Sequence, residues 1–491
     1  MTTTRHARRR RRVIAAGAAG GAAFVAARRR RPDATAGRRI APGPRGHFLV
    51  GSLPEIRKDN AQTFLDGWRE YGDIVRYPGA FDIYCIAHPD HVKHILQDNH
   101  RNYKHPPFLN RKLREIVGDG LVTTEGDYWR SQRRLTQPAF HRQRIATYGT
   151  LMTDETALML DGWREPAERG ETVDMRVQMM HISLTILAKA LFGADWSEQL
   201  AVMEPAVTVA NTHADRRLLS LVDLPLSLPL PAFRRFNEAK RTFDAIVYGL
   251  IAERRRSGED TGDLTSMLLA ARDEETGAGM TDTQVRDELM TFLMAGHETV
   301  SAGLSWVWYL LSKNPDAWER VCAEVDEVLD GRVPTVDDLP QLRYVRMVVD
   351  ETLRLYPPLF VIPRTPLEPE EIGGYDIPAG NTFIALCPYV THRHPEFWEN
   401  PEGFDPERFT PERSAGRHRF AYFPFAAGPR KCIGDYFGLM EMQFVVAMVA
   451  QRYRPDLVAG FPVSPQPAIS LRPRHGLLMT LSPRSRERRP G

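Results

Sequence analysis

The sequence predicts a mainly α-helical single domain with small β-sheets, and three observations lead to this fold class. The chain has 491 residues, of which 42% are hydrophobic and 26% charged, so it can bury a large core. Strand-like runs are few, whereas most other segments show the helical spacing of apolar residues. No fixed-period repeat or long linker divides the chain beyond residue 40. The strand-like runs lie at 73–78, 83–87, 372–386 and 469–481, and the clearest helical segments at 181–193, 236–256, 284–312, 314–329, 341–355 and 436–452.

Residues 1–39 differ from this predicted domain, which covers residues 40–491. They contain 12 arginines and one acid and carry a charge of +11, whereas the remaining residues sum to −8. The apolar run at 13–27 is shorter than the roughly 20 residues of a spanning helix and has arginines on both sides, which is atypical of an export signal. We therefore expect a disordered basic arm on a cytoplasmic protein, with weak peripheral contact to anionic lipid and no nucleic-acid binding. An export signal and a misassigned start codon stay open as alternatives.

Four cysteines occur without any C-x-x-C pair, which argues against a disulfide framework or a thiolate zinc site: Cys85, Cys322, Cys387 and Cys432. By default each is a small buried apolar residue. Cys432 differs because the stretch FAAGPRKCIG (425–434) places it in a glycine-rich loop directly before an apolar helix. Backbone N–H donors and the helix dipole favour a thiolate there and lower its pKa. Such a sulfur serves as a nucleophile or as a metal ligand, and no local signature of a cysteine hydrolase accompanies it.

The central helical segment 284–312 is apolar nearly all round and yet carries AGHET at 295–299. Gly296 costs roughly 1 kcal/mol against alanine in a helix, which suggests a close approach to the backbone. Ala295 and Thr299 are four residues apart and Glu298 lies between them, so they fall along one side. On its own this pattern fits a kinked core helix equally well, with a satisfied threonine and a glutamate that reaches solvent.

A second helix, predicted at 341–355, ends in ETLRLYPP. Its Glu351 and Arg354 are three residues apart and therefore favour an ion pair. Such a pair lies either on a solvated face or, beside the apolar residues before the Pro-Pro stop, in the interior.

Taken together, these motifs resemble those of the cytochromes P450. FAAGPRKCIG matches all five defined positions of that family's haem-thiolate loop, F-x-x-G-x-R-x-C-x-G. AGHET, ETLR, PERF (406–409) and WRSQR (129–133) are similar to further family motifs and occur in the family's order. The resemblance covers essentially everything beyond residue 40, and it implies the cytochrome P450 fold with haem between the central helix and the cysteine loop.

The resemblance also implies roles for individual residues. Cys432 would ligate the iron of haem b. The other residues expected to bind the cofactor are Trp129 as an N–H donor, Arg133, Arg364 and Arg430 at the propionates, Phe425 over the sulfur, Gly428 and Gly434 in the turn, and Ala295 on the central helix. Glu298 and Thr299 would be the catalytic acid and alcohol that deliver protons through water, and Arg408 of PERF would join Glu351 and Arg354. The chain departs from the family at Val300, where a second hydroxyl often follows, and at Gly438, often alanine, which affects packing only.

The implied function is a monooxygenase that inserts one oxygen atom of O2 into an apolar substrate. Because 491 residues leave no room for a flavin domain, we expect electrons from a ferredoxin and its ferredoxin reductase, received at a basic patch with Arg430 and Lys431. The alternatives are a peroxide-driven peroxygenase or an isomerase on the same fold, and a non-catalytic haem sensor; the retained Glu298 and Thr299 argue against both.

The predicted pocket walls are aliphatic and poor in charge, which suits a terpenoid, a steroid-like or a fatty acyl skeleton. They are the segments 103–120, 218–233 and 357–362, Phe292, and the turn near Pro467. SLPLPAFRRFNEA (227–239) resembles bacterial cytochromes P450 that oxidise sesquiterpenes.

Overall fold

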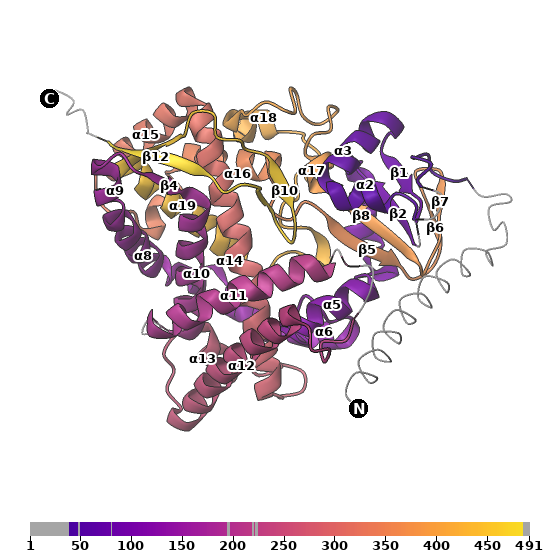
Figure 1. Cartoon of the computed structure of the whole chain (residues 1–491), viewed down its shortest axis with the longest axis horizontal. Coiled ribbons are helices and arrows are strands. Elements are labelled where there is room, and N and C mark those ends of the chain that lie inside the picture. Colours follow the sequence, from indigo (N-terminus) through magenta and orange to yellow (C-terminus); the bar gives the residue numbers. More distant parts are fainter. Residues whose placement is uncertain are drawn as a thin grey trace, which may run out of the picture.

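The structure is a computed structural model that describes residues 39–484 except 48–49, 80, 194–196, 219 and 221–223. It is mainly helical with small sheets, which confirms the predicted fold class (Figure 1). The expectations for residues 1–38 lie outside the described residues. Arg39 belongs to the folded part, since its N–H donates to Asp376 Oδ2 at 2.8 Å and its carbonyl accepts from the Asp376 N–H at 2.9 Å. Within the described ranges, no helix is both long enough and apolar enough to cross a membrane.

The helices make up most of the molecule, and the main sheet lies toward one end of it (Figure 1). Their bounds are α2 (Leu53–Lys58), α3 (Asn60–Tyr71), α4 (Pro89–Lys93), α5 (Pro107–Val117), α6 (Gly126–Thr136), α7 (Arg142–Ala146), α8 (Gly149–Gly162), α9 (Arg164–Glu168), α10 (Met175–Phe192), α11 (Ser197–Leu218), α12 (Pro231–Ser257), α13 (Leu264–Ala270), α14 (Asp282–Lys313), α15 (Pro315–Leu329), α16 (Arg343–Leu355), α17 (Pro388–Thr391), α18 (Pro411–Ser414) and α19 (Asp435–Arg452).

The strands form small sheets within the described part of the chain. The largest has the order β1-β2-β8-β5-β3, in which β2 and β8 are parallel and the other neighbours antiparallel. Three further groups are β4-β12-β9, β10-β11 and β6-β7. The strand bounds are β1 (Ile74–Tyr77), β2 (Asp82–Ile86), β3 (Tyr103–Lys104), β4 (Thr172–Asp174), β5 (Ile362–Pro366), β6 (Glu370–Ile372), β7 (Tyr375–Ile377), β8 (Thr382–Leu386), β9 (Tyr453–Leu457), β10 (Pro465–Pro467), β11 (Leu471–Pro473) and β12 (Leu478–Pro483).

Helix α14 runs through the middle of the molecule (Figure 1). It begins with a capping box, in which the Thr281 hydroxyl accepts from the Gln284 N–H and the Gln284 side chain accepts from the Thr281 N–H. Most of its residues are buried because α10, α16 and α19 pack around it. The prediction of a helix through the core at 284–312 is confirmed.

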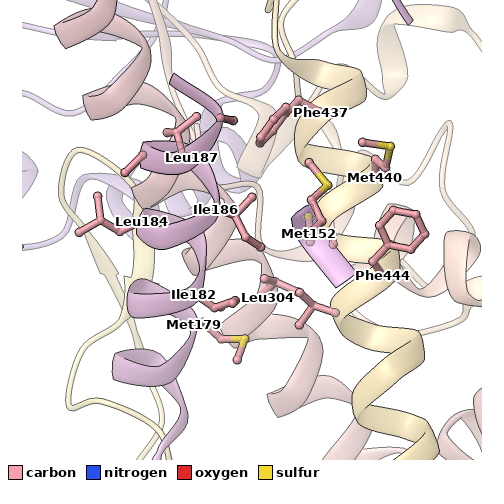
Figure 2. Close-up of a cluster of buried hydrophobic side chains, with 14 of the residues drawn as sticks. Met152, Met179, Ile182, Leu184, Ile186, Leu187, Leu304, Phe437, Met440 and Phe444 are labelled. Carbon is pink, nitrogen blue, oxygen red and sulfur yellow. The ribbon is translucent and has the colours of Figure 1, made fainter. Parts of the chain in front are cut away.

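The main core lies between α8, α10, α14 and α19. Figure 2 shows Ile186 of α10, Leu304 of α14, Met152 of α8 and Phe444 of α19 directed toward one another, and each of these side chains is fully buried. Burial of such side chains stabilises the fold by about 1.5 to 3 kcal/mol each. This core fixes the positions of α14 and α19, and therefore of the motifs that these helices carry.

Candidate active site

The cysteine loop is built around one obligatory glycine. Gly428 has a φ of +68°, and a Cβ atom there would lie 1.8 Å from the Leu96 carbonyl oxygen, so any other residue clashes. The loop then turns through a 3₁₀ helix (Gly428–Arg430) and returns so that the Cys432 N–H donates to the Phe425 carbonyl at 2.9 Å. Gly434 has a φ of −96°, and no turn requires a glycine there, which corrects the expectation for this second glycine.

The Cys432 side chain is exposed at the start of α19, and the surrounding protein still governs its ionisation. Burial raises the pKa of its thiol, while a hydrogen bond from the Gly434 N–H and the charges of Arg133 and Lys431 act in the opposite direction. The sequence predicted a lowered pKa. That prediction is wrong for the protein alone, because the loss of hydration outweighs the loop's donors.

Helix α14 packs against α19, the helix that follows the cysteine loop. A Cβ atom on Gly438 of α19 would lie 3.2 Å from a methyl group of Val300, so Gly438 allows a close contact between the two helices. The Phe140 ring contacts Phe292 of α14, with 4.9 Å between ring centroids, and also lies near Gly434. The expectation that Gly438 affects packing is thus consistent with the structure, and Phe292 is buried with its ring against Phe140.

The AGHET segment presents one accessible side. Ala295 is exposed although it lies in the interior of α14, and Thr299 is partly exposed one turn later. The Thr299 hydroxyl donates to the Ala295 carbonyl at 2.8 Å. Gly296 faces elsewhere, because a Cβ atom on it would lie 2.7 Å from Leu187 of α10. The expected close approach to the backbone at Gly296 is therefore found, and the approaching group is Leu187, so this glycine allows α10 and α14 to pack.

An excess of buried positive charge lies beside the loop. Arg364 on β5 is 5% exposed, and among the described residues it forms no ion pair; its guanidinium donates to the Pro363 carbonyl at 2.8 Å. Arg430 pairs with Glu125, whose other oxygen accepts from the His105 ring at 2.7 Å. Burial, together with the neighbouring charge of Arg430, lowers the pKa of Arg364 to about 10. One carboxylate thus faces two buried guanidiniums and an imidazole, an arrangement that lacks negative charge.

Trp129 and Arg133 on α6 reach the same region. The Arg430 guanidinium lies over the Trp129 ring, 3.9 Å from its centroid, which is a cation–π contact. Arg133 donates to the Lys431 carbonyl at 3.2 Å, and burial lowers its pKa. Lys431 is half exposed and pairs with Asp435.

Glu298 lies apart from Thr299, in a buried polar network. Its Oε1 accepts from Ser470 Oγ at 2.9 Å and from Arg472 Nη1 at 2.8 Å. Both partners come from the C-terminal hairpin, 172 and 174 residues away in sequence. No local sequence pattern therefore predicts their contact with Glu298. Sequence reasoning also missed Glu125 and His105, since a lone acid and a lone histidine carry no motif.

The Glu351 cluster is entirely internal. Arg354 donates from Nε and Nη2 to the two oxygens of Glu351, at 2.7 and 2.8 Å, and both side chains are fully buried. Arg408 of the 3₁₀ helix Pro406–Phe409 donates to Glu351 Oε1 at 3.3 Å. Of the two interpretations left open by the sequence, the buried one is correct.

Some of the predicted substrate walls are apolar and partly exposed in the described part of the chain. Phe108 of α5 packs with Phe81 and Phe383, at centroid distances of 5.2 and 6.1 Å. Leu224, Leu230 and Leu359 are about two-fifths exposed, and part of the segment 218–233 lies outside the described residues. These walls stay a prediction.

Comparison with known proteins bears directly on this arrangement. Residues 41–479 match the family model described as Cytochrome P450. The chain is 37% identical to cyclooctatin synthase from Streptomyces melanosporofaciens, over 88% of this chain and 93% of that protein. It is 38% identical to cyclooctat-9-en-7-ol 5-monooxygenase of the same organism (81% and 85%) and 34% identical to pentalenene oxygenase from Streptomyces avermitilis (80% and 86%). The crystal structure of the cytochrome P450DA heme domain has a TM-score of 0.81 at 27% identity, covering 91% of this chain and 98% of that one.

The chain therefore belongs to the cytochrome P450 family and is a monooxygenase of the oxidoreductase class, with haem b as its cofactor. The residues fit this cofactor on their own chemistry. Arg364, buried without an ion pair among the described residues, and Arg430, partly buried and paired with Glu125, suit the two propionates of haem. A thiol that accepts the Gly434 N–H suits a thiolate ligand of iron.

Proposed function

We propose that this protein inserts one oxygen atom of O2 into a cyclic terpenoid, with electrons supplied by separate redox proteins. The observation that carries the proposal is the accessible Ala295–Thr299 side of α14, a helix that packs against α19 directly after the loop of Cys432. A hydroxyl and an acid next to a thiolate loop are the groups that proton-coupled activation of O2 requires.

Within this proposal, Cys432 is the iron ligand, and Arg364 and Arg430 bind the propionates. Trp129 holds the Arg430 guanidinium in place through the cation–π contact with its ring. Arg133, Phe425 and Gly428 complete the loop around the sulfur. When bound, haem supplies the redox chemistry that cleaves O2. The chain contributes a positively charged cradle, a shielded sulfur and a polar group on α14.

Thr299 and Glu298 manage protons in this reaction. The Thr299 hydroxyl donates to the Ala295 carbonyl, which leaves its oxygen lone pairs free to accept a hydrogen bond. Glu298 is the acid behind it and supplies protons through water. General acid–base groups of this kind contribute about a hundredfold or more to a rate.

The substrate class rests on the names of the relatives and on the apolar character of the expected walls. Pentalenene and cyclooctat-9-en-7-ol are, by their names, an alkene and an alkenol. The ring cluster of Phe81, Phe108 and Phe383 and the exposed Leu224, Leu230 and Leu359 offer apolar surface to such a molecule.

A ferredoxin and its ferredoxin reductase are the proposed electron donors. Lys431 is half exposed beside the cysteine loop, and Arg142 lies over the Tyr436 ring at 5.4 Å. An acidic ferredoxin would be attracted to cations placed this close to the sulfur.

The test is product formation under ¹⁸O₂ with NADPH, ferredoxin and ferredoxin reductase, compared with hydrogen peroxide alone. We expect one labelled oxygen atom per product molecule and dependence on the redox proteins. Product from peroxide alone, or product without label, contradicts the proposal. Cys432→Ser is expected to lose the red-shifted carbon monoxide band and all oxidation.

Thr299→Ala tests proton delivery. We expect continued NADPH consumption, roughly a hundredfold less coupled product and more peroxide. Ser305→Ala is the matched control, since Ser305 donates to the Ser301 carbonyl one turn back on the same helix at 2.7 Å. Equal coupling in the two variants would make Thr299 a packing group.

A further inference from the structure

The carboxylate of Glu298 is held on one side only. Its Oε1 accepts two hydrogen bonds, from Ser470 and Arg472. Its Oε2 is buried and has no hydrogen-bond partner among the described residues. A buried carboxylate oxygen without a partner is costly, so its persistence calls for a functional reason.

Arg472 holds a second acid with its other terminal nitrogen. Its Nη2 donates to Asp215 Oδ2 at 2.6 Å, and Asp215 Oδ1 accepts from the Ile469 N–H at 3.1 Å. The network therefore ties three elements together: Glu298 on α14, Arg472 on β11 and Asp215 on α11. Figure 1 shows the hairpin of β10 and β11 beside α14, and the two are in contact.

Two acids balance the charge of Arg472 in this network. Burial alone would lower the pKa of Arg472, but Asp215 and Glu298 outweigh it and raise the pKa. A buried carboxylate is stable as an anion only when a cation or several donors face it. Arg472 is that cation for Glu298, and Asp215 fixes where its guanidinium lies.

The exposed fraction of the side chains increases from Glu298 to Arg472 and Asp215. The Glu298 side chain is 2% exposed, whereas those of Arg472 and Asp215 are 17% and 18% exposed. The arginine therefore separates the buried glutamate from solvent and controls which oxygen of Glu298 is committed. Oε1 is occupied, and only Oε2 is left to exchange a proton.

We propose that Arg472, held in place by Asp215, is a positioning residue for the proton chemistry of Glu298. It holds Oε1 of Glu298 turned to the hairpin, and it leaves Oε2 as the oxygen through which protons pass. In each passage Oε2 takes a proton from water and releases it toward Thr299, so the carboxylate ends as it began. This inference rests on the role of Glu298 in the proposed function.

Variants of the full-length, haem-loaded protein test it through the rate of NADPH oxidation and its solvent deuterium isotope effect. Arg472→Met is expected to slow oxidation about tenfold and to increase the isotope effect. Arg472→Lys, which keeps the charge, should recover most of the rate, and Asp215→Asn should lose a few-fold. Arg474→Met is the matched control, since Arg474 lies two residues further along and its ion-pair partner is Asp59 at 3.7 Å.

A double variant shows whether Arg472 acts through Glu298. Glu298→Gln combined with Arg472→Met should be no slower than Glu298→Gln alone, because both changes remove one function. Infrared difference spectra between each protein and its Glu298→Gln counterpart provide a readout besides activity. The Glu298 band in these spectra should shift in Arg472→Met, because Oε1 loses the hydrogen bond from Arg472.

The outcomes separate this inference from the proposed function. Wild-type oxidation and coupling in Glu298→Gln would overturn the role of Glu298 itself. Three outcomes would overturn the inference about Arg472 alone. The first is slowed NADPH oxidation in Glu298→Gln together with a wild-type rate in Arg472→Met. The others are a rate in Arg472→Lys no better than in Arg472→Met, and additive losses of rate in the double variant. If Arg472→Met fails to load haem, Arg472→Lys and Asp215→Asn decide, since both keep a polar group at each position.

Discussion

Two glutamates of this protein are buried and paired with arginine, yet their surroundings differ. Glu351 accepts from Arg354 at both oxygens, and its Oε1 also accepts from the Asp405 N–H at 2.9 Å and from Arg408. Glu298 accepts only at Oε1, and its Oε2 has no partner among the described residues. Both carboxylate oxygens of Glu351 therefore have hydrogen-bond donors (the saturated cluster), whereas only one oxygen of Glu298 does (the half-satisfied acid).

Their arginines differ in the same way. Arg354 is fully buried and also donates to the carbonyls of His392, Pro401 and Gly403, whereas Arg472 is partly exposed and divides its charge between two acids. A cluster in which every donor has an acceptor can serve stability alone. An acid that keeps one oxygen free retains the capacity to exchange a proton, so the comparison distinguishes a structural ion pair from a candidate functional one.

The largest expected effect is on the saturated cluster. Glu351→Ala leaves two buried guanidiniums without their carboxylate, and we expect the free energy of unfolding to fall by about 3 to 5 kcal/mol, with loss of haem binding. Chemical denaturation measures this. Glu407→Ala removes a half-exposed partner of Arg320 and should change little. If Glu351→Ala unfolds with the same free energy as wild type, the Glu351 cluster would not be the structural ion pair that distinguishes it from the Glu298 network.

Exchange of arginine for lysine sharpens the comparison. Arg354 uses three nitrogens at once, which an ammonium cannot reproduce, so Arg354→Lys should cost about 2 to 3 kcal/mol of stability. Arg472 gives one nitrogen to each acid, and Arg472→Lys should cost less than about 1 kcal/mol. Equal losses in thermal and chemical denaturation would contradict the difference in geometry.

The saturated cluster should also make stability depend on pH through His392. Burial, followed by the charge of Arg354, lowers the pKa of His392 to about 3 from its usual 6.5. The unfolded chain therefore binds a proton that the folded one refuses, so this stabilisation is complete above pH 6.5 and is lost as pH falls toward 3. At pH 5 the loss of stability from this residue amounts to about 2 kcal/mol. Stability measured from pH 7 to 5 should fall more steeply in wild type than in His392→Gln, and parallel curves would contradict this.

The half-satisfied acid should show a small effect on stability and a large one on chemistry. Glu298→Gln keeps the shape of the side chain, and Arg472 retains Asp215, so the free energy of unfolding should change by about 1 kcal/mol or less. NADPH consumption should nevertheless slow, because the supply of protons is impaired. A large loss of stability with unchanged turnover would place Glu298 with Glu351 as a structural residue.

The smallest expected effect comes from outside both clusters. Removal of residues 1–38 takes away no contact described in the site, so haem content and turnover should persist. Removal of 1–39 also deletes the two hydrogen bonds between Arg39 and Asp376, and it should cost about 1 kcal/mol more. If the 1–38 deletion cannot load haem, the predicted domain boundary is wrong.

Local sequence patterns were enough to predict much of the fold and part of the candidate site. The helices around 282–313 and 435–452 were predictable because their apolar spacing spans several turns. Short strands such as β3 and β10 were not, since two or three residues carry too little pattern. The cysteine loop was recognisable because one loop holds its glycine, arginine and cysteine within ten residues.

By itself, the sequence determined the mainly helical class, the central helix and the identity of Cys432 as the exceptional cysteine, because these depend on neighbours along the chain. The tertiary structure alone decided which acid meets which arginine. Glu298 meets Arg472 across 174 residues, and Gly296 meets Leu187 of α10. Burial, too, is a property of the folded chain: it turned Glu351 and Arg354 from a possible surface pair into an internal one and raised the pKa of the Cys432 thiol. Both depend on removing charged or polar groups from water, which only the packed fold accomplishes.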